Sequence, residues 1–355
     1  MEEKVLMKGN EALARAAIEA GCRHFFGYPI TPQTEVAAYM AKQMPKIGGV
    51  FLQAESEVSA INMVYGAAGA GARVMTSSSS PGISLKSEGI SYIAGSDLPC
   101  VICNIVRGGP GLGGIQPAQS DYFQATKGGG HGDYHLIVLA PASVQEMVDL
   151  VKEAFDLADF YRMPVMIMGD GMLGQMMEPV VFGNYKSKKE LAEKTWATVG
   201  TEMKRTHNIV NSLYITPEEL EKLVQERYKK YAVIEEEEAR AEEYMCEDAD
   251  IIIAAYGTIA RVAKSAIQRA RAKGIKVGLI RPITLWPFPG KTFAKYAGKV
   301  KSFLSVEMSM GQMIEDVRLS VEGKTPVEFY GRTGGMIPSP EEIVEKLEAM
   351  TGGVK

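Results

Sequence analysis

Cysteine is scarce in this sequence, with four residues in 355. So few thiols exclude the disulfide framework that stabilises many small secreted proteins. Two of them, Cys100 and Cys103, form a C-x-x-C, but the surrounding LPCVICNIV is typical of a buried strand. Side chains three positions apart on a strand point to opposite faces, so this pair does not indicate a metal site. We expect the pair to be two ordinary buried thiols.

A surplus of positive charge and a long apolar run are also missing. The formal net charge is -4, which gives no electrostatic footprint for nucleic acid or for an anionic membrane surface. No apolar stretch approaches the length that spans a bilayer. The segment MEEKVLMKGNEAL lacks the basic region and apolar core of an export signal. We therefore predict a cytoplasmic protein that binds neither nucleic acid nor a membrane.

Signatures of hydrolases and nucleotidases are absent, since the sequence has no G-x-S-x-G, H-E-x-x-H or P-loop. One nucleotide signature needs consideration, because Gly109–Gly114 matches G-x-G-x-x-G and follows a predicted strand. In the dinucleotide-binding fold the last glycine opens a helix, whereas Pro117 would break a helix that began here. An NAD(P)-binding dehydrogenase that uses this loop stays open as an alternative function.

Strand and helix patterns alternate along most of the chain. Over residues 1–180, and again over residues 249–355, short apolar strands lead into helical patterns. This alternation predicts an α/β fold in which helices cover both faces of a doubly wound, mostly parallel sheet. Residues 181–248 are charged and helix-prone, which is typical of a solvated linker helix or of a segment lying over a partner. The sequence thus predicts two domains and a linker, with the second domain the smaller.

Three polar residues follow predicted strands, at the sheet edge where ligands of α/β proteins bind. Thr31 precedes Pro32 at the start of a predicted helix, whose free N–H groups favour an anion. Glu57 begins a helix rich in glycine and alanine, where an acid can lie close to a cofactor ring. Arg107 ends a buried strand and can hold a carboxylate through two hydrogen bonds.

Each of these residues also has a purely structural interpretation. Thr31 could only cap the N-terminus of its helix. Glu57 could be an exposed acid in the first helical turn, stabilised by the helix dipole. Arg107 could form a strand-end ion pair with Asp121.

An ordered series of short motifs contains these residues. It consists of Tyr28-Pro29-Ile30-Thr31-Pro32, Ser56-Glu57, Thr76 through Ser80-Pro81-Gly82, and Val106-Arg107 with Gln119-Ser-Asp121. Each motif alone is weak, but the ordered set resembles the alpha subunits of 2-oxoacid:ferredoxin oxidoreductases. The similarity covers nearly the whole chain and is greatest to the branched-chain (2-oxoisovalerate) type, followed by the 2-oxoglutarate type. In one departure, Ser79 stands before Ser80-Pro81-Gly82 where many members have Ser-Gly-Pro-Gly.

The resemblance implies a thiamine-diphosphate-binding fold of the pyrimidine-domain type, followed by a smaller transketolase-C-terminal-like α/β domain. It implies the oxidative decarboxylation of a 2-oxoacid to its acyl-CoA, with electrons passed to ferredoxin. Glu57 would be catalytic, because its carboxylate would hydrogen-bond N1′ of the aminopyrimidine. Thr31 and Arg107 would orient the substrate carboxylate. The other cofactor-binding positions that the resemblance implies are Tyr28, Pro29, Ser80 and Gly82.

The resemblance also implies partner chains. Gly169-Asp170-Gly171 is similar to the start of the metal- and diphosphate-binding motif of thiamine enzymes, but Asn184 comes too early and Asn208 too late to complete it. We therefore predict a turn at this strand end and no metal ligand on this chain. A beta subunit would hold Mg²⁺ and the diphosphate. Gamma and ferredoxin-like delta subunits would complete an enzyme that uses coenzyme A and iron–sulfur clusters, the clusters lying on chains other than this one. A non-catalytic scaffold role in the same complex stays open.

Overall fold

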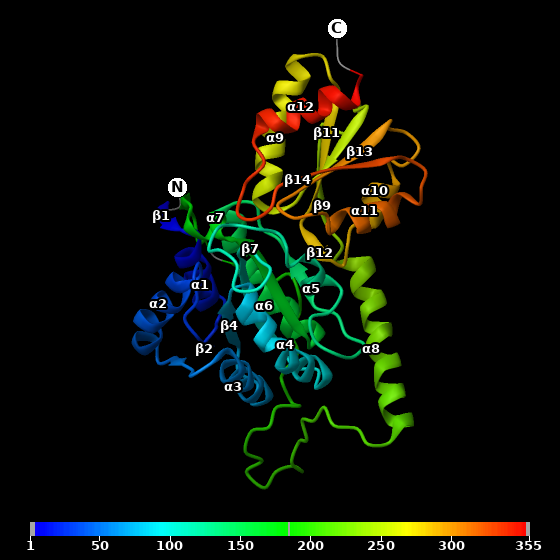
Figure 1. Cartoon of the computed structure of the whole chain (residues 1–355). Coiled ribbons are helices and arrows are strands. Elements are labelled where there is room, and N and C mark those ends of the chain that lie inside the picture. The colour runs from blue at the N-terminus through cyan, green and yellow to red at the C-terminus, as the bar shows by residue number, and fades with distance from the viewer. Residues whose placement is uncertain (1–3, 184, 353–355) are drawn as a thin grey trace.

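Two β-sheets organise the chain, as the computed structural model shows for residues 4–183 and 185–352 (Figure 1). The larger sheet has seven strands in the order β12-β6-β7-β5-β4-β2-β3. All its pairings are parallel except that of β12 with β6. These strands are β2 (His24–Gly27), β3 (Val50–Gln53), β4 (Val74–Ser78), β5 (Cys100–Val106), β6 (Ile137–Leu139), β7 (Pro164–Asp170) and β12 (Thr284–Trp286). The predicted α/β fold with a mostly parallel sheet is confirmed.

Helices cover both faces of the larger sheet, and its central strands are therefore buried along their whole length. On one face, α1 packs against α2, α6 and α7, and on the other α3 packs against α4. Their bounds are α1 (Gly9–Glu19), α2 (Thr34–Gln43), α3 (Glu57–Gly69), α4 (Ser80–Gly95), α6 (Val144–Tyr161) and α7 (Gly171–Gln175). Two short helices, η1 (Met44–Ile47) and α5 (Tyr122–Thr126), lie in connections.

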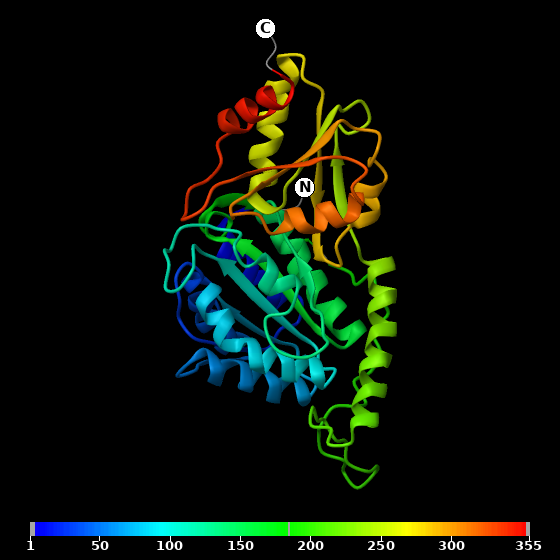
Figure 2. The same cartoon turned by 45° about the vertical axis from the view of Figure 1, so that its right-hand side comes forward.

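The smaller sheet has five strands in the order β14-β13-β10-β11-β9, with β9 antiparallel to β11 and the other pairings parallel. Its strands are β9 (Ala241–Tyr244), β10 (Ile251–Ala254), β11 (Val277–Pro282), β13 (Ser302–Glu307) and β14 (Val327–Gly331). The helices of this part are α9 (Gly257–Ala272), α10 (Gly290–Ala294), α11 (Met313–Val321) and α12 (Pro340–Met350). The separation into a larger and a smaller α/β unit is visible in Figures 1 and 2.

The connecting segment differs from the helical linker that its charge pattern predicts. After β8 (Met177–Val180), which pairs with β1 (Val5–Lys8), the described residues form no helix or strand until α8 (Pro217–Glu237). The α8 helix runs along the side of the larger unit up to the smaller one (Figures 1 and 2). Strand β9, expected within the linker, belongs to the smaller sheet, and β12 returns to the larger sheet. The domain limits at residues 180 and 248 stay a prediction.

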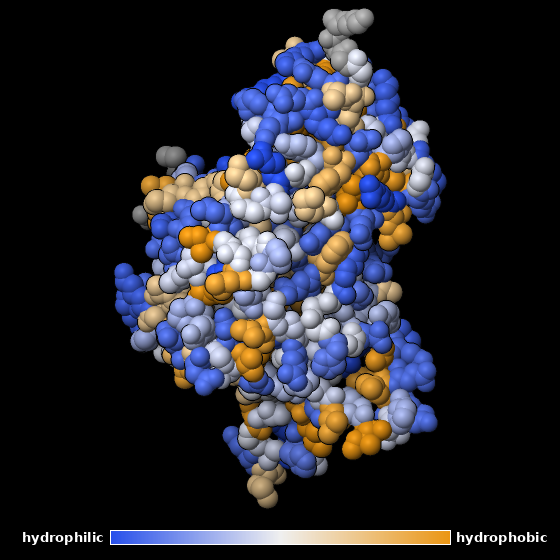
Figure 3. Space-filling view, in the orientation of Figure 1, coloured by the Kyte–Doolittle hydropathy of each residue, from blue (hydrophilic) through white to orange (hydrophobic). Residues whose placement is uncertain are grey.

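Apolar side chains are exposed along this irregular segment. Figure 3 shows them at the bottom of the view, where the segment meets the start of α8. They include Val199, Met203, Ile209, Leu213 and Ile215. In the described part of the chain, no helix has both the length and the hydropathy to cross a bilayer.

Buried polar contacts join the two units. The side chain of Gln119 donates to the carbonyl of Tyr256 at 3.0 Å and accepts from the N–H of Met308 at 3.0 Å. Thr258 donates its hydroxyl to the buried carboxylate of Asp170 at 2.5 Å. Because a buried polar group that loses its partner costs free energy, these contacts fix how the units sit against each other. They therefore also fix the loops that meet at the carboxyl edge of the larger sheet.

Candidate functional site

Glu57 is buried at the first position of α3, with 6% of its surface exposed. Ser56 caps this helix, since its hydroxyl accepts from the N–H of Ser59 at 3.2 Å. The interpretation of Glu57 as an exposed first-turn acid is therefore wrong. Within residues 4–183 and 185–352, no donor makes a hydrogen bond to its carboxylate. A buried carboxylate without a donor from its own chain is a candidate to receive one from a ligand.

Gly82 lies directly against this carboxylate, in the first turn of α4. A Cβ atom at Gly82 would stand 2.7 Å from Oε1 of Glu57 and would collide with Oγ of Ser78. The hydroxyls of Ser78 and Ser79 are buried and have no hydrogen-bond partner among the described residues. Because glycine has no side chain, the end of β4 and the start of α4 can approach Glu57 closely. The structure thus brings Gly82 and Glu57 together.

Arg107 ties two loops together instead of forming an ion pair. Its Nη1 donates to the carbonyl of Thr31 at 2.9 Å, and its Nη2 donates to the carbonyl of Leu112 at 2.9 Å. Its Nε is buried without a partner. The alternative in which Arg107 pairs with Asp121 is wrong, because within the described residues its Nη atoms donate to these two carbonyls and not to Asp121, which accepts from the side chain of Asn104 at 2.8 Å. The remaining N–H groups of the guanidinium are therefore the ones that could bind a carboxylate.

Thr31 is exposed and lies before α2, which begins at Thr34 after the N-cap residue Gln33. The prediction that Thr31 caps this helix with Pro32 in its first turn is wrong. The backbone of Gln33 is not yet helical, and its buried amide side chain accepts from Ser77 at 2.5 Å. Since Thr31 makes no cap hydrogen bond, its hydroxyl is available to a ligand.

Ser80 connects this group to the interior. Its hydroxyl donates to the carbonyl of Arg107 at 3.2 Å and accepts from the N–H of Arg107 at 3.1 Å. The N–H of Ser80 donates to Oδ1 of Asn104 at 3.2 Å. Burial raises the pKa of Asp121, although hydrogen bonds from Asn104 and Ser80 oppose that effect. The network holds Ser80 and Arg107 in one fixed arrangement.

Tyr28 and Pro29 follow β2 and are exposed. The carbonyl of Tyr28 accepts from the side chain of Gln33 at 3.3 Å. No hydrogen bond in the described part of the chain joins either side chain to Glu57 or Arg107. Of the predicted residues, the structure links Glu57 with Gly82, and Thr31, Arg107 and Ser80 with one another, but not Tyr28 or Pro29.

A hollow of about 370 Å³ opens beside Ser80, between the two units. The larger unit contributes Gly109, Pro110 and Asp121 to its wall, and the smaller unit contributes Ser309 and Thr333. The hollow is thus a space that only the assembled pair of units creates.

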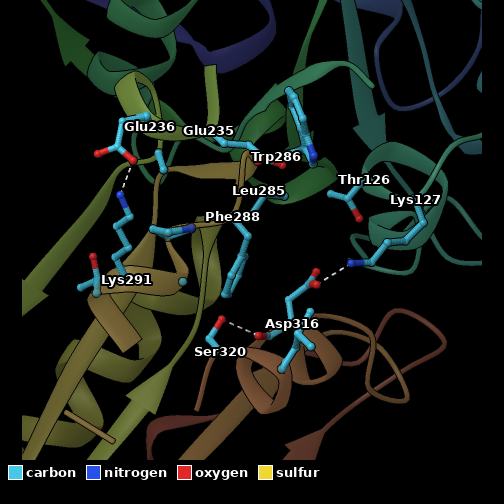
Figure 4. A pocket seen from close by; sticks show the side chains of 15 residues that line it. Thr126, Lys127, Glu235, Glu236, Leu285, Trp286, Phe288, Lys291, Asp316 and Ser320 are labelled. Carbon is cyan, nitrogen blue, oxygen red and sulfur yellow. Dashed lines mark hydrogen bonds and ion pairs between the residues drawn. The ribbon is translucent and has the colours of Figure 1, made fainter. Parts of the chain in front are cut away.

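A second hollow, of about 460 Å³, lies between the end of α8 and helices α10 and α11 (Figure 4). Both lysines in its wall are paired, Lys127 with Asp316 and Lys291 with Glu236. None of the predicted site residues lines it.

The glycine-rich loop Gly109–Gly114 and the strand-end residue Asp170 both have structural roles. The Gly109–Gly114 loop closes on itself, because the N–H of Gly114 donates to the carbonyl of Gly108 at 3.0 Å, and the next helix begins only at Tyr122. The loop therefore lacks the helix that a dinucleotide fingerprint requires. Asp170 ends β7 and caps α7, accepting from the N–H groups of Met172 at 2.9 Å and Leu173 at 3.0 Å. The predicted turn is thus a direct strand-to-helix junction; Asn184 lies outside the described residues.

The cysteines are buried, and burial raises the pKa of Cys22 and of Cys100 to about 12. Because the thiolate is the reactive form, we expect a disulfide reagent such as Ellman's reagent to titrate less than one thiol per native chain. After denaturation in guanidinium chloride the same assay should titrate all four. Rapid labelling of the native chain would contradict this expectation.

Lys86 is a buried residue of this region that the sequence analysis did not single out. It is fully buried on α4 and donates to Oγ1 of Thr76 at 2.7 Å. A signal exists in the sequence, because Gly82, Lys86, Ile90 and Ile93 follow one another at helical spacing. A lysine on the apolar face of a helix is unusual. This spacing could have identified it.

The carboxylate of Glu57 is the group at this site that fits an aminopyrimidine ring. N1′ of such a ring needs a hydrogen-bond partner, and Glu57 offers a buried carboxylate with no donor from the described chain. Gly82 leaves room beside Oε1. Among the described residues, no group of three or more histidine, cysteine or acidic side chains is placed to hold a metal ion.

Comparison with known families and structures gives consistent matches. Residues 15–246 match the model described as pyruvate flavodoxin/ferredoxin oxidoreductase, thiamine diP-bdg, and residues 249–343 match pyruvate:ferredoxin oxidoreductase core domain II. Ketoisovalerate oxidoreductase subunit VorB of Methanothermobacter marburgensis is 51% identical, over 98% of this chain and 98% of that protein. 2-Oxoglutarate synthase subunit KorA of Methanothermobacter thermautotrophicus is 37% identical, over 99% of this chain and 100% of that protein.

Solved structures agree with these matches. The 2-oxoglutarate:ferredoxin oxidoreductase from Magnetococcus marinus, with 2-oxoglutarate, coenzyme A and succinyl-CoA bound, superposes with a TM-score of 0.89 at 29% identity. This chain covers 65% of that chain and is itself covered to 98%. A split-gene transketolase, as an inactive beta4 tetramer, superposes with a TM-score of 0.61 at 14% identity, which shows the fold alone. The predicted thiamine-diphosphate-binding and transketolase-like fold is confirmed.

Proposed function

Because the chain belongs to the pyruvate flavodoxin/ferredoxin oxidoreductase family, we propose that it is the subunit of a 2-oxoacid:ferredoxin oxidoreductase that holds the pyrimidine ring of thiamine diphosphate. The observation that carries the proposal is the buried carboxylate of Glu57, which has no donor from the described chain and lies against Gly82. Both its burial and its position at the start of α3 suit a group that binds a flat, polar ring. The complete enzyme would oxidise a 2-oxoacid to its acyl-CoA and would work in the cytoplasm.

The proposal assigns the remaining parts of the enzyme to partner chains. Asp170, the one acid that resembles a metal-motif residue, is engaged in capping α7 and in the hydrogen bond from Thr258. A beta subunit would therefore hold Mg²⁺ and the diphosphate. Gamma and ferredoxin-like delta subunits would complete the complex, whose iron–sulfur clusters pass electrons to ferredoxin.

Thiamine diphosphate supplies the electron sink into which the bond to the departing carboxylate breaks. In the proposed site, Glu57 accepts a hydrogen bond from N1′ and holds the ring in the tautomer that can remove a proton. Gly82 lets the ring approach that carboxylate. Arg107 and the hydroxyl of Thr31 orient the substrate carboxylate beside the ring.

The substrate is proposed from the relatives. We expect 2-oxoisovalerate to be the preferred 2-oxoacid, since the relatives that are 50% and 51% identical to this chain are ketoisovalerate oxidoreductase subunits. 2-Oxoglutarate is the second candidate, because the next relatives are 2-oxoglutarate synthase subunits.

The complex itself tests the proposal. The chain would be purified together with its beta, gamma and delta partners and assayed with 2-oxoisovalerate, 2-oxoglutarate and pyruvate. We expect a reduction of ferredoxin that depends on coenzyme A and has its highest kcat/KM with 2-oxoisovalerate. The proposal would be overturned if ferredoxin were reduced at the same rate without coenzyme A. It would also be overturned if the complex reduced NAD(P) and not ferredoxin.

Arg107→Lys is expected to raise KM for the 2-oxoacid about tenfold while lowering kcat less, because a lysine presents a point charge where the guanidinium presents several fixed donors. Steady-state kinetics of the reconstituted complex measure this split. Arg318→Lys, at an exposed position of α11, is the matched control and should change neither constant. If Arg107→Lys left KM unchanged, Arg107 would not be a substrate-binding residue.

A further inference from the structure

Lys86 is a completely buried cation for which the proposed function so far has no role. Its Nζ donates to Oγ1 of Thr76 at 2.7 Å and to the carbonyl of Ser77 at 3.1 Å. Both acceptors are neutral. A buried ammonium held only by neutral groups loses most of its hydration energy, so its charge is costly unless an anion lies near.

The anion that faces Lys86 is Glu57. Gly82, one helical turn before Lys86 on α4, lies against the Glu57 carboxylate, with 2.7 Å between Oε1 and the position of a Cβ. Lys86 contacts Thr76 and Ser77 of β4, and the position of a Gly82 Cβ lies beside both Ser78 of β4 and the Glu57 carboxylate, so the two charged side chains approach the same end of β4. The other titratable group that faces Lys86 is Cys103 on β5, and burial raises the pKa of its thiol, so that it is neutral.

The surroundings of Lys86 shift its pKa away from that of an exposed lysine. Burial lowers the pKa of Lys86 to about 7, and the negative charge of Glu57 opposes this effect. Because the folded-state pKa lies below that of an unfolded lysine, Lys86 binds a proton less readily in the native chain than in the unfolded chain between these two values. The negative charge of Glu57 thus favours the ammonium form of Lys86.

We propose that Lys86 is a positioning residue that acts through Glu57: its buried ammonium is the countercharge that holds the Glu57 carboxylate in place beside the pyrimidine site. The proposal deepens the function given above and rests on it. Coulomb attraction between the two groups is mutual, so the ammonium of Lys86 also attracts the carboxylate of Glu57. Because Lys86 is fully buried and Glu57 is largely buried, such a charge is screened little by water when it acts on the carboxylate that a bound ring would contact.

A purely structural role for Lys86 makes different predictions. If the side chain only joins α4 to β4, its loss would lower stability and leave the pH dependence of the reaction unchanged. If it is the countercharge of Glu57, its loss would alter that pH dependence even in folded protein. The test therefore uses the pH profile rather than the rate alone.

The first experiment compares Lys86→Met and Lys86→Arg in the reconstituted complex. We expect Lys86→Met to lower kcat about tenfold at neutral pH and to displace the acid limb of the kcat profile, and Lys86→Arg, which keeps the charge, to restore part of both. Lys152→Met is the matched control, because Lys152 is also buried but pairs with Glu19 at 2.8 Å on the other side of the sheet. A Lys86→Met complex with the profile of the Lys152→Met complex would overturn the proposal.

A second experiment needs neither the cofactor nor turnover. The full chain, labelled with ¹³Cε-lysine, is titrated by NMR, and the Lys86 signal is assigned from the spectrum of Lys86→Arg. In Glu57→Gln the titration midpoint of Lys86 should fall, because the carboxylate that favours the ammonium is gone. An identical midpoint in the wild-type and Glu57→Gln chains would reject the coupling, even if Lys86→Met does not fold. If the complex shows no 2-oxoacid oxidation but the midpoint moves, the proposed function fails while the coupling stands.

Discussion

A Glu57→Gln complex will oxidise its 2-oxoacid roughly 10²- to 10⁴-fold more slowly than the wild-type complex, which is the range that a positioned acid–base group contributes. Glutamine has nearly the shape of glutamate, so the buried site stays filled. It cannot accept a proton, however, and its neutral amide does not favour the protonated pyrimidine. The loss should therefore appear in kcat rather than in the KM of the 2-oxoacid.

Glu55→Gln is the control for this substitution. Glu55 lies two residues earlier and is exposed, so the same chemical change there should leave kcat unaltered. Gel filtration and thermal unfolding of both complexes establish that assembly and folding are intact. Full activity in an assembled Glu57→Gln complex would favour the alternative in which this chain is a non-catalytic scaffold of the same enzyme.

Local patterns in the sequence were sufficient to predict the helix that carries Glu57 and the parallel sheet beside it. Glu57 was expected to begin a helix rich in glycine and alanine, and α3 begins at Glu57, with Ser56 as its N-cap. The alternation of apolar strands with helical runs predicted the parallel sheet, because each strand buried on both faces needs a continuous apolar run. Helix starts and buried strands depend on residues that are close together in the chain. Such local patterns can be recognised in the sequence.

Contacts between distant residues could not be obtained in this way. The Nη atoms of Arg107 donate to the carbonyls of Thr31 and Leu112, and the prediction that Arg107 binds a substrate carboxylate did not include these contacts. Backbone carbonyls leave no mark in the sequence, so neither partner was predictable. The start of α2 was also misplaced: its N-cap is Gln33, whose buried side chain accepts a hydrogen bond from Ser77, a residue 44 positions away on β4.

The connecting segment shows a limit of helix propensity. Residues 181–216 contain charged, helix-prone stretches, yet they form no helix among the described residues, whereas α8 does. The difference is packing, because α8 places Tyr231 against Trp286, with ring centroids 5.6 Å apart. Short helices in water are marginal without such contacts. Helix propensity alone therefore does not locate the part of this segment that is helical.

Gly82→Ala will lower the kcat of the complex about 100-fold and the stability of the chain by about 1–3 kcal/mol. The added Cβ would stand 2.7 Å from Oε1 of Glu57 and would collide with Oγ of Ser78. Both neighbours are buried, and Ser78 at the end of β4 leaves the added methyl group no other space. The carboxylate must therefore shift away from the pyrimidine site, and a displacement of about 1 Å of a reacting group costs about two orders of magnitude in rate.

Gly66→Ala separates this effect from a general response to alanine in a helix. Gly66 lies in α3, the same helix as Glu57, and a Cβ there meets no atom within 4 Å. Since alanine favours the helix more than glycine does, this variant should be about 0.5–1 kcal/mol more stable and fully active. Chemical denaturation measures the first effect and steady-state kinetics the second. If Gly82→Ala lost stability but kept wild-type kcat, Glu57 would not need the close approach that Gly82 allows, and the carboxylate could not be the group that contacts the pyrimidine ring.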